Sequence, residues 1–218
     1  MERKTVWNII TVVELIFAAF VIWFDLFIPT LVILAICAVS MLVRKERLSA
    51  LGFKKLDRPL LAIAFIFLAI LGWTLVQLGL IMPVMNHLTG TTQDLSTFED
   101  IKGNVSKLIF LLIATWTLAA FGEEIVYRGY LQARVSSLFS DARVGIIAAV
   151  AITSILFGLA HSEQGVIGVV VTFFDAIVFS IIKLRLDGNL WGSILAHGLS
   201  NTIGIVAFFF VGPVYGLW

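Results

Sequence analysis

Two adjacent glutamates and an arginine interrupt an otherwise apolar stretch of this sequence. Residues 121–131 read FGEEIVYRGYL and close an apolar run that begins at Leu108. Arg128 follows four residues after the second of the two glutamates, Glu123 and Glu124. A carboxylate at membrane depth costs about 2.5 to 3.5 kcal/mol on insertion scales, so such groups usually face a protein interior and have a function. The stretch is therefore a candidate site for chemistry.

Two further polar islands follow, and each holds one histidine. LFGLAHS contains His161, four residues after Phe157, and AHGLSN contains His197, four residues before Asn201. Residues four apart on a helix project from the same side, so each pair would face one way. One other histidine, His87, precedes a polar loop. We interpret it as an ordinary interfacial side chain.

Helical spacing predicts different roles for the two glutamates. Glu124 and Arg128 lie one turn apart, so they can pair and lower each other's insertion cost. Glu123 lies about 100° away around the helix. It is therefore free to point elsewhere and to act as a general base or acid.

Two kinds of hydrolysis fit these residues. In one, Glu123, His161 and His197 hold a divalent metal, because two imidazoles and a carboxylate match a catalytic zinc site. In the other, a glutamate with His161 deprotonates water, while His197 and Asn201 donate hydrogen bonds to the oxyanion. Asparagine is a poor zinc ligand and a good oxyanion donor, which favours the second mechanism, without a cofactor. Serine hydrolysis is disfavoured, since no serine stands in a GxSxG setting.

The three islands together resemble the motifs of the CPBP family, across about Leu108 to Gly204. The motif residues, in chain order, are Glu123-Glu124-x-x-x-Arg128, Phe157-x-x-x-His161 and His197-x-x-x-Asn201. The flanking sequences EEIVYRGYL and LWGSILAHGLSN match as well. This family comprises type II CAAX prenyl endopeptidases and bacteriocin-processing enzymes, also known as abortive-infection (Abi) membrane proteins.

The resemblance implies an intramembrane endopeptidase that acts on a peptide or a prenylated protein, with CAAX-type processing as one form. It implies that Glu123 and His161 activate water and that His197 and Asn201 stabilise the oxyanion. Glu124 and Arg128 would be supporting residues. The family's long-standing description as metalloproteases leaves zinc as the alternative.

One residue departs from the expected family pattern. Asp175, in TFFDAIVFS, stands in the middle of an apolar run where small residues are usual in this family. It would either hydrogen-bond into the site or pair with a neighbouring helix.

The composition places all of these residues in a membrane protein. The chain has 218 residues, of which 60% are hydrophobic and 13% charged, whereas a soluble domain is about 45–50% apolar and about 25% charged. The net charge of +1 comes with no basic face, which argues against a nucleic-acid partner. The single cysteine, Cys37, excludes an intrachain disulfide and a cysteine-based metal site.

Seven apolar runs approach the roughly 20 residues that a helix needs to cross a bilayer. We predict an all-α polytopic bundle of seven or eight spans, because the runs are continuous rather than alternating. The seven predicted runs are Val6–Trp23, Phe27–Val43, Leu60–Met82, Leu108–Tyr130, Val144–Ala160, Val166–Ile182 and Leu190–Val211. The first run is expected to be a retained signal anchor, since no small-x-small cleavage pattern follows it.

These bounds separate Glu123 from His161 along the membrane normal. Glu123 falls towards the cytoplasmic end of the fourth run, and His161 falls at the outer end of the fifth. The two can meet if the fourth helix continues past Tyr130, and the apolar LQARVSSLF that follows allows this.

Positive charges predict the orientation and the organisation of the chain. With the N-terminus in the cytoplasm, all 15 Lys and Arg residues except Lys102 and Lys107 lie inside. We expect an integral protein of a bacterial or archaeal plasma membrane. We expect a single membrane domain, residues 1–218. Residues 1–104 would supply the N-terminal spans and a surface segment, and residues 105–212 would form the catalytic core. The basic stretch 44–59 is expected to lie on the cytoplasmic surface as an amphipathic connector.

Two other classes of membrane protein fit the sequence less well than an enzyme does. A non-catalytic bacteriocin-immunity or peptide-binding membrane protein needs no Glu/His/His/Asn set, so the intact set argues against it. A transporter would show matched broken helices in repeated halves, and no self-similar halves are visible in the sequence.

Overall fold

Helices form all the regular structure of the part that the structure describes, residues 2–218 of a computed structural model. The α-helices are α1 (Glu2–Trp23), α2 (Pro29–Arg44), α3 (Pro59–Val76), α4 (Met82–Thr89), α5 (Val105–Ala114), α6 (Gln132–Ser137), α7 (Ala142–Leu159), α8 (Gly165–Arg185) and α9 (Leu190–Val211). Three π-helical segments are η2 (Gln77–Ile81), η4 (Thr115–Glu123) and η5 (Ile125–Leu131). Three short 3₁₀ helices are η1 (Leu48–Leu51), η3 (Ser96–Ile101) and η6 (Ser162–Gln164).

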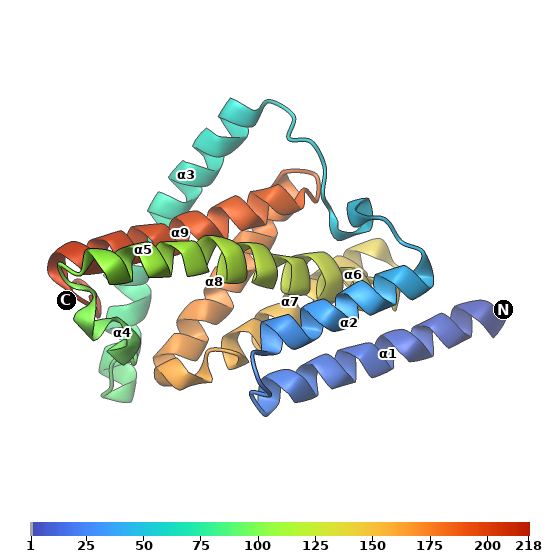
Figure 1. Ribbon diagram of the computed structural model, residues 1–218, viewed down its shortest axis with the longest axis horizontal. Coiled ribbons are helices and arrows are strands. Elements are labelled where there is room, and N and C mark those ends of the chain that lie inside the picture. Colours follow the sequence, from blue (N-terminus) through green and yellow to red (C-terminus); the bar gives the residue numbers. More distant parts are fainter. Residues whose placement is uncertain (1) are drawn as a thin grey trace.

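Six of these helical stretches are long and apolar enough to cross a membrane, and α2 adds a shorter apolar helix. Each coincides with one of the seven predicted runs, so the predicted all-α polytopic fold is confirmed. Figure 1 shows α1 and α2 as an antiparallel pair beside the segment that runs from α5 to α6. On the other side of that segment lies α9, while α7 and α8 pack behind it and α3 stands out from the body.

The fourth helix is much longer than its apolar run. It continues from Val105 to Ser137, a stretch of 33 residues that includes the π-helical segments η4 and η5. The predicted end at Tyr130 was therefore too early. The helix continues through the apolar residues after Tyr130, as the sequence allowed. Because Glu123 lies in the middle of this continuous helix, it can meet a residue at the far end of α7.

The basic segment after α2 is largely exposed and is anchored to the protein at Leu51. Only η1 is helical, and Leu51 within it is buried against Gly129 and Leu190. The Leu190 backbone N–H donates to the carbonyl of Gly52 at 2.8 Å. Gly52 has φ +96°, and a Cβ there would lie 2.6 Å from the carbonyl oxygen of Gly188. This close approach fixes the start of α9 beside the middle of the long helix.

The residues after α9 fold back along η2 and α4. Pro83 has no N–H, so the preceding turn lacks one helical donor for its carbonyls. The indole Nε1–H of Trp218 donates to the Gly79 carbonyl at 2.8 Å, and the Leu217 N–H donates to the Leu78 carbonyl at 2.9 Å. The tail thereby satisfies backbone groups of an irregular helical segment.

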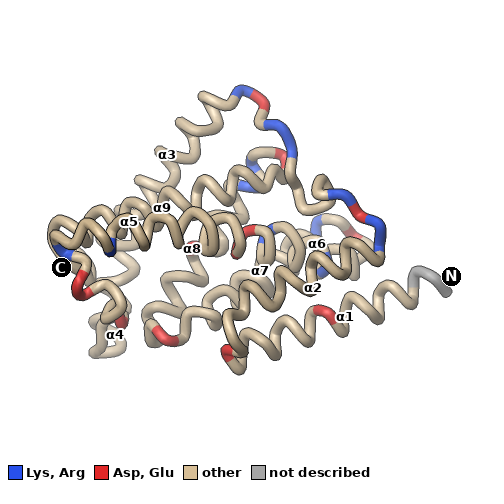
Figure 2. Tube along the Cα trace, in the orientation of Figure 1, with Lys and Arg blue, Asp and Glu red and all other residues tan. Residues whose placement is uncertain are grey.

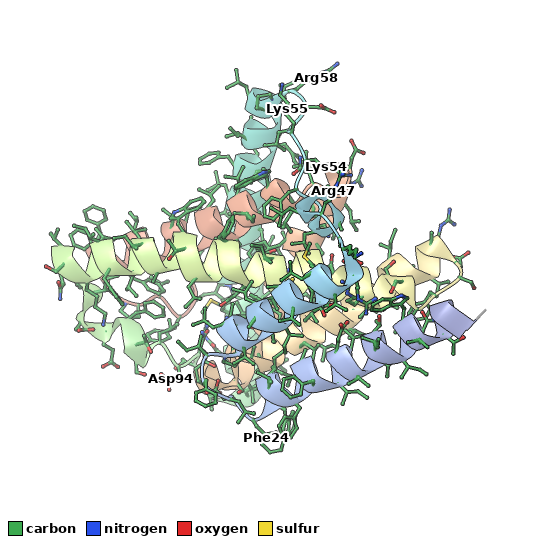
Figure 3. All side chains as sticks on the ribbon, turned by 45° about the vertical axis from the view of Figure 1, so that its right-hand side comes forward. Phe24, Arg47, Lys54, Lys55, Arg58 and Asp94 are labelled. Carbon is green, nitrogen blue, oxygen red and sulfur yellow. The ribbon has the colours of Figure 1, made fainter. Side chains whose placement is uncertain are left out.

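Opposite charges mark the two ends of the molecule. Figure 2 shows Lys and Arg gathered where α2 ends and α3 begins, with acidic residues at the far end near α4. In Figure 3, Arg47, Lys54, Lys55 and Arg58 lie at one end, and Asp94 lies at the other. His87, at the acidic end in the last turn of α4, is exposed, as an interfacial side chain would be.

Candidate active site

One cavity of about 420 Å³ brings the polar islands together. Glu123, His161, His197 and Asn201 all line it, although they come from η4, the turn after α7, and α9. Its remaining wall comes from apolar and small polar side chains of several helices, including Phe157. The four predicted catalytic residues therefore share one space, and their roles in catalysis stay predictions.

Glu124 is fully buried beneath the cavity, and its carboxylate is held from two sides. The guanidinium of Arg128 donates to Glu124 Oε1 at 2.9 Å, and His197 Nδ1 lies 2.9 Å from the same oxygen. Glu124, Arg128 and His197 are each at most 3% exposed. The pairing of Glu124 with Arg128 follows the predicted helical spacing, whereas the contact with His197 joins helices 73 residues apart in sequence. Glu124 thus fixes the orientation of the His197 ring.

The His161 ring is oriented by its own backbone. His161 Nδ1 lies 2.8 Å from the carbonyl oxygen of Phe157, one turn earlier. A carbonyl can only accept a hydrogen bond, so Nδ1 carries the proton and Nε2 presents a lone pair in the neutral ring. This tautomer leaves Nε2 available as an acceptor or base on the cavity side.

Two phenylalanines hold the histidines in place. The Phe157 ring centroid lies 4.7 Å from that of His161 and 5.8 Å from that of His197. On the opposite side of the His197 ring, Phe179 stacks at 5.0 Å with an interplanar angle of 20°. The Arg128 guanidinium covers the Phe157 ring at 4.4 Å. The motif spacing pointed to Phe157, but Phe179 has no signal in the sequence, since it is one of many apolar residues in α8.

Glu123 points away from this buried cluster and lines the cavity. Its Oε2 is buried and has no hydrogen-bond partner among the described residues. A buried carboxylate oxygen without a partner costs free energy and usually signals a bound water, ion or substrate group. Glu124 Oε2 is buried without a partner too, so the two glutamates differ in their other contacts: Glu124 is paired with Arg128, whereas Glu123 lines the cavity.

The side chains of Glu123, His161 and His197 do not gather as a metal site. Within residues 2–218, no group of three or more His, Cys, Asp or Glu side chains could hold a metal ion as placed. The donor set in this arrangement does not fit the tetrahedral zinc alternative.

Asp175 also lines the cavity. The sequence alone had not decided between this position and a pairing with a neighbouring helix. Its Oδ1 accepts hydrogen bonds from Trp73 Nε1 at 2.6 Å and from Gln77 Nε2 at 2.8 Å. The expected pairing with a neighbouring helix is thus met, and Asp175 faces the cavity, while its two printed bonds go to Trp73 and Gln77 rather than to the predicted catalytic residues. Trp73 and Gln77 were missed, although a glutamine inside the apolar run 60–82 was a visible signal.

Comparison with known proteins gave a match to one family model. A family model described as Type II CAAX prenyl endopeptidase Rce1-like matches residues 105–203. The matched segment contains all three motifs and agrees with the resemblance seen in the sequence. No match was found among curated proteins or among solved structures.

Proposed function

Because residues 105–203 of this integral membrane protein belong to the type II CAAX prenyl endopeptidase family, we propose that it cleaves peptide bonds with a water molecule activated by Glu123. The family supports an intramembrane protease of CAAX type in general, with a protein substrate. The bilayer excludes water from the substrate, so the enzyme must hold water in its own cavity.

The observation that carries this proposal is the position of Glu123 on the cavity wall. Each of the two adjacent carboxylates has a buried Oε2 without a hydrogen-bond partner. Glu124 is held by Arg128 and His197 through Oε1, whereas Glu123 lines the cavity, where a water molecule can reach it. A general base needs a lone pair within hydrogen-bond reach of the proton that it removes. Glu123 meets that requirement for a water in the cavity, and Nε2 of His161 can accept the second hydrogen bond of that water.

The reaction balances with these residues alone. Glu123 takes one proton from water as the water oxygen bonds to the scissile carbonyl carbon, and the carbonyl electrons move to oxygen. Asn201 donates a hydrogen bond to this oxyanion, and His197 does so through Nε2 when its ring is protonated, with the Glu124 carboxylate as counter-ion. When the tetrahedral intermediate collapses, the C–N bond breaks and Glu123 returns its proton to the leaving nitrogen.

We propose that no metal takes part, since Glu123, His161 and His197 are not arranged as ligands. Exhaustive chelation should then leave peptide cleavage unchanged. Loss of cleavage on chelation, with recovery on addition of Zn²⁺, would establish the zinc alternative.

The test compares purified full-length protein with Glu123→Gln on a peptide library. The amide keeps the size of the side chain but cannot take a proton, so activity should fall about 10²–10⁴-fold. Glu99→Gln, an exposed glutamate in η3, is the matched control and should behave as wild type. Glu123→Gln activity above a tenth of wild type excludes the base role. Binding of peptides without cleavage by the wild type would instead support a non-catalytic peptide-binding protein.

A further inference from the structure

The cavity has a strong asymmetry in the charges that line it. Two carboxylates, Glu123 and Asp175, face it, and of the described residues that form its wall none is a lysine or an arginine. His161 and His197 are the other titratable groups on the wall, and the proposed reaction already uses both. Asp175 is left as a carboxylate that the chemistry does not use.

Asp175 is held firmly in a defined position. Trp73 and Gln77 lie one turn apart at the junction of α3 and η2, and both donate to the same oxygen, Oδ1. Neither bond involves Oδ2. The residue is only partly buried and lines the cavity, so a molecule in the cavity can reach it. A partner of Asp175 would therefore meet an oriented carboxylate.

Asp175 also lies close to the reacting groups along α8. Phe179, four residues further along α8, stacks on the His197 ring, and four helical residues rise about 6 Å at 1.5 Å per residue. An extended peptide advances about 3.3–3.6 Å per residue. A substrate with its scissile bond at Glu123 and His197 would bring a side chain one or two residues away to Asp175.

On the basis of the function proposed above, we propose that Asp175 determines specificity by binding a lysine or arginine side chain of the substrate, one or two residues from the scissile bond. A cationic side chain that enters an apolar cavity loses its hydration, and a carboxylate already in place offsets that cost. The substrate class is then a peptide or protein with a basic residue next to the scissile bond.

The test uses fluorogenic peptides that differ at one position, lysine against norleucine, scanned over two residues on each side of the scissile bond. At one position, kcat/KM of the wild type for the lysine peptide should exceed that for the norleucine peptide at least tenfold. Asp175→Asn keeps an oxygen acceptor for Trp73 and Gln77 but loses the charge. It should remove this preference by lowering kcat/KM for the lysine peptide, with the norleucine peptide changed less than threefold.

Several outcomes would overturn the inference. An equal loss of cleavage of both peptides in Asp175→Asn, together with a lower Tm, would show that Asp175 only joins α3 to α8. A wild type that cleaves the lysine and norleucine peptides equally at all four positions would overturn the inference by itself. If the wild type cleaves no peptide at all, the proposed function fails instead. Trp73→Phe, which keeps the charge, should retain the lysine preference.

Discussion

Adjacent glutamates have opposite environments in this protein. Glu124 is at 0% exposure between Arg128 and His197, while Glu123 borders the cavity. A buried charge is tolerated when it is paired, and removal of one partner leaves the other uncompensated. The two residues should therefore respond differently to the same substitution.

Glu124→Gln should destabilise the protein, because it leaves the buried Arg128 charge unpaired. The cost expected for breaking a buried pair is about 3–5 kcal/mol, so the Tm in detergent should fall well below wild type and activity should fall with it. Glu123→Gln, which removes no ion pair, should keep the wild-type Tm. Equal Tm values for the two variants would contradict the pairing role.

Asn201 should act as a hydrogen-bond donor to the oxyanion. Loss of one such donor costs about 10²–10³ in turnover, so Asn201→Ala should lower kcat strongly and change KM little. Asn201→Asp should be as damaging, since a carboxylate repels the oxyanion. Steady-state kinetics on one peptide decide this, and an active Asn201→Asp enzyme would point to a metal ligand instead.

At the scale of elements, the long helix contains two π-helical segments next to the candidate site. η4 ends at Glu123 and η5 begins at Ile125, so Glu124 stands between two stretches with i→i+5 hydrogen bonds. Such wider turns occur mostly at functional sites, and here they accompany the divergence of the two carboxylates. The helix is held against α9 by Trp116, whose Nε1 donates to Thr202 Oγ1 at 3.2 Å.

Gly198→Ala should disrupt this packing. A Cβ at Gly198 would lie 2.5 Å from Cζ3 of Trp116, so the rigid indole must move and carry η4 away from α9. Overpacking of this kind costs about 1–3 kcal/mol, and both Tm and cleavage should fall. Gly72→Ala is the matched control, since a Cβ at that helical glycine meets nothing within 4 Å. A Gly198→Ala protein with wild-type Tm and activity would contradict the close contact.

Glu46 ties the start of the basic segment to α6. The Arg134 guanidinium donates to its two oxygens at 3.0 and 2.7 Å and holds the pKa of Glu46 below its usual range. This stabilisation is complete above the unfolded-state pKa of about 4.3 and is lost as pH falls through the lower folded-state value.

The Tm difference between wild type and Glu46→Gln should therefore be constant near neutral pH and shrink below about pH 4. Thermal unfolding in detergent across pH 7 to 3 measures it, with the exposed Asp57→Asn as control. A difference that grows on acidification would contradict the role of the ion pair.

At the scale of the whole molecule, the distribution of charge indicates how the protein sits in the bilayer. The basic segment after α2 and the acidic loop near Asp94 lie at opposite ends (Figures 2 and 3). The positive-inside rule then favours a cytoplasmic location for the basic end and for the N-terminus.

Cysteine labelling tests this orientation. In a Cys37→Ser background, Glu99→Cys should react with a membrane-impermeant maleimide in intact cells, and Lys55→Cys only after lysis. Both positions are exposed, so access depends on the side of the membrane. The reverse pattern would overturn the proposed orientation.

The sequence was sufficient for the spans and for the pairing of Glu124 with Arg128, because long apolar runs and helical spacing act locally. It was insufficient for contacts made between helices. The stacking of Phe179 on His197 and the bond from Glu124 to His197 depend on how α8, α9 and the long helix pack. The π-helical segments likewise have no local signature, so the fourth helix was predicted to end at Tyr130.

The tail after α9 has a practical consequence for work with this protein. Leu217 and Trp218 cover the carbonyls of Leu78 and Gly79, beside Pro83. A truncation at Gly212, or an affinity tag that displaces Trp218, would leave these carbonyls unprotected in a hydrophobic environment. Val214 also lines the cavity, so such a preparation could lose activity for reasons unrelated to the catalytic residues.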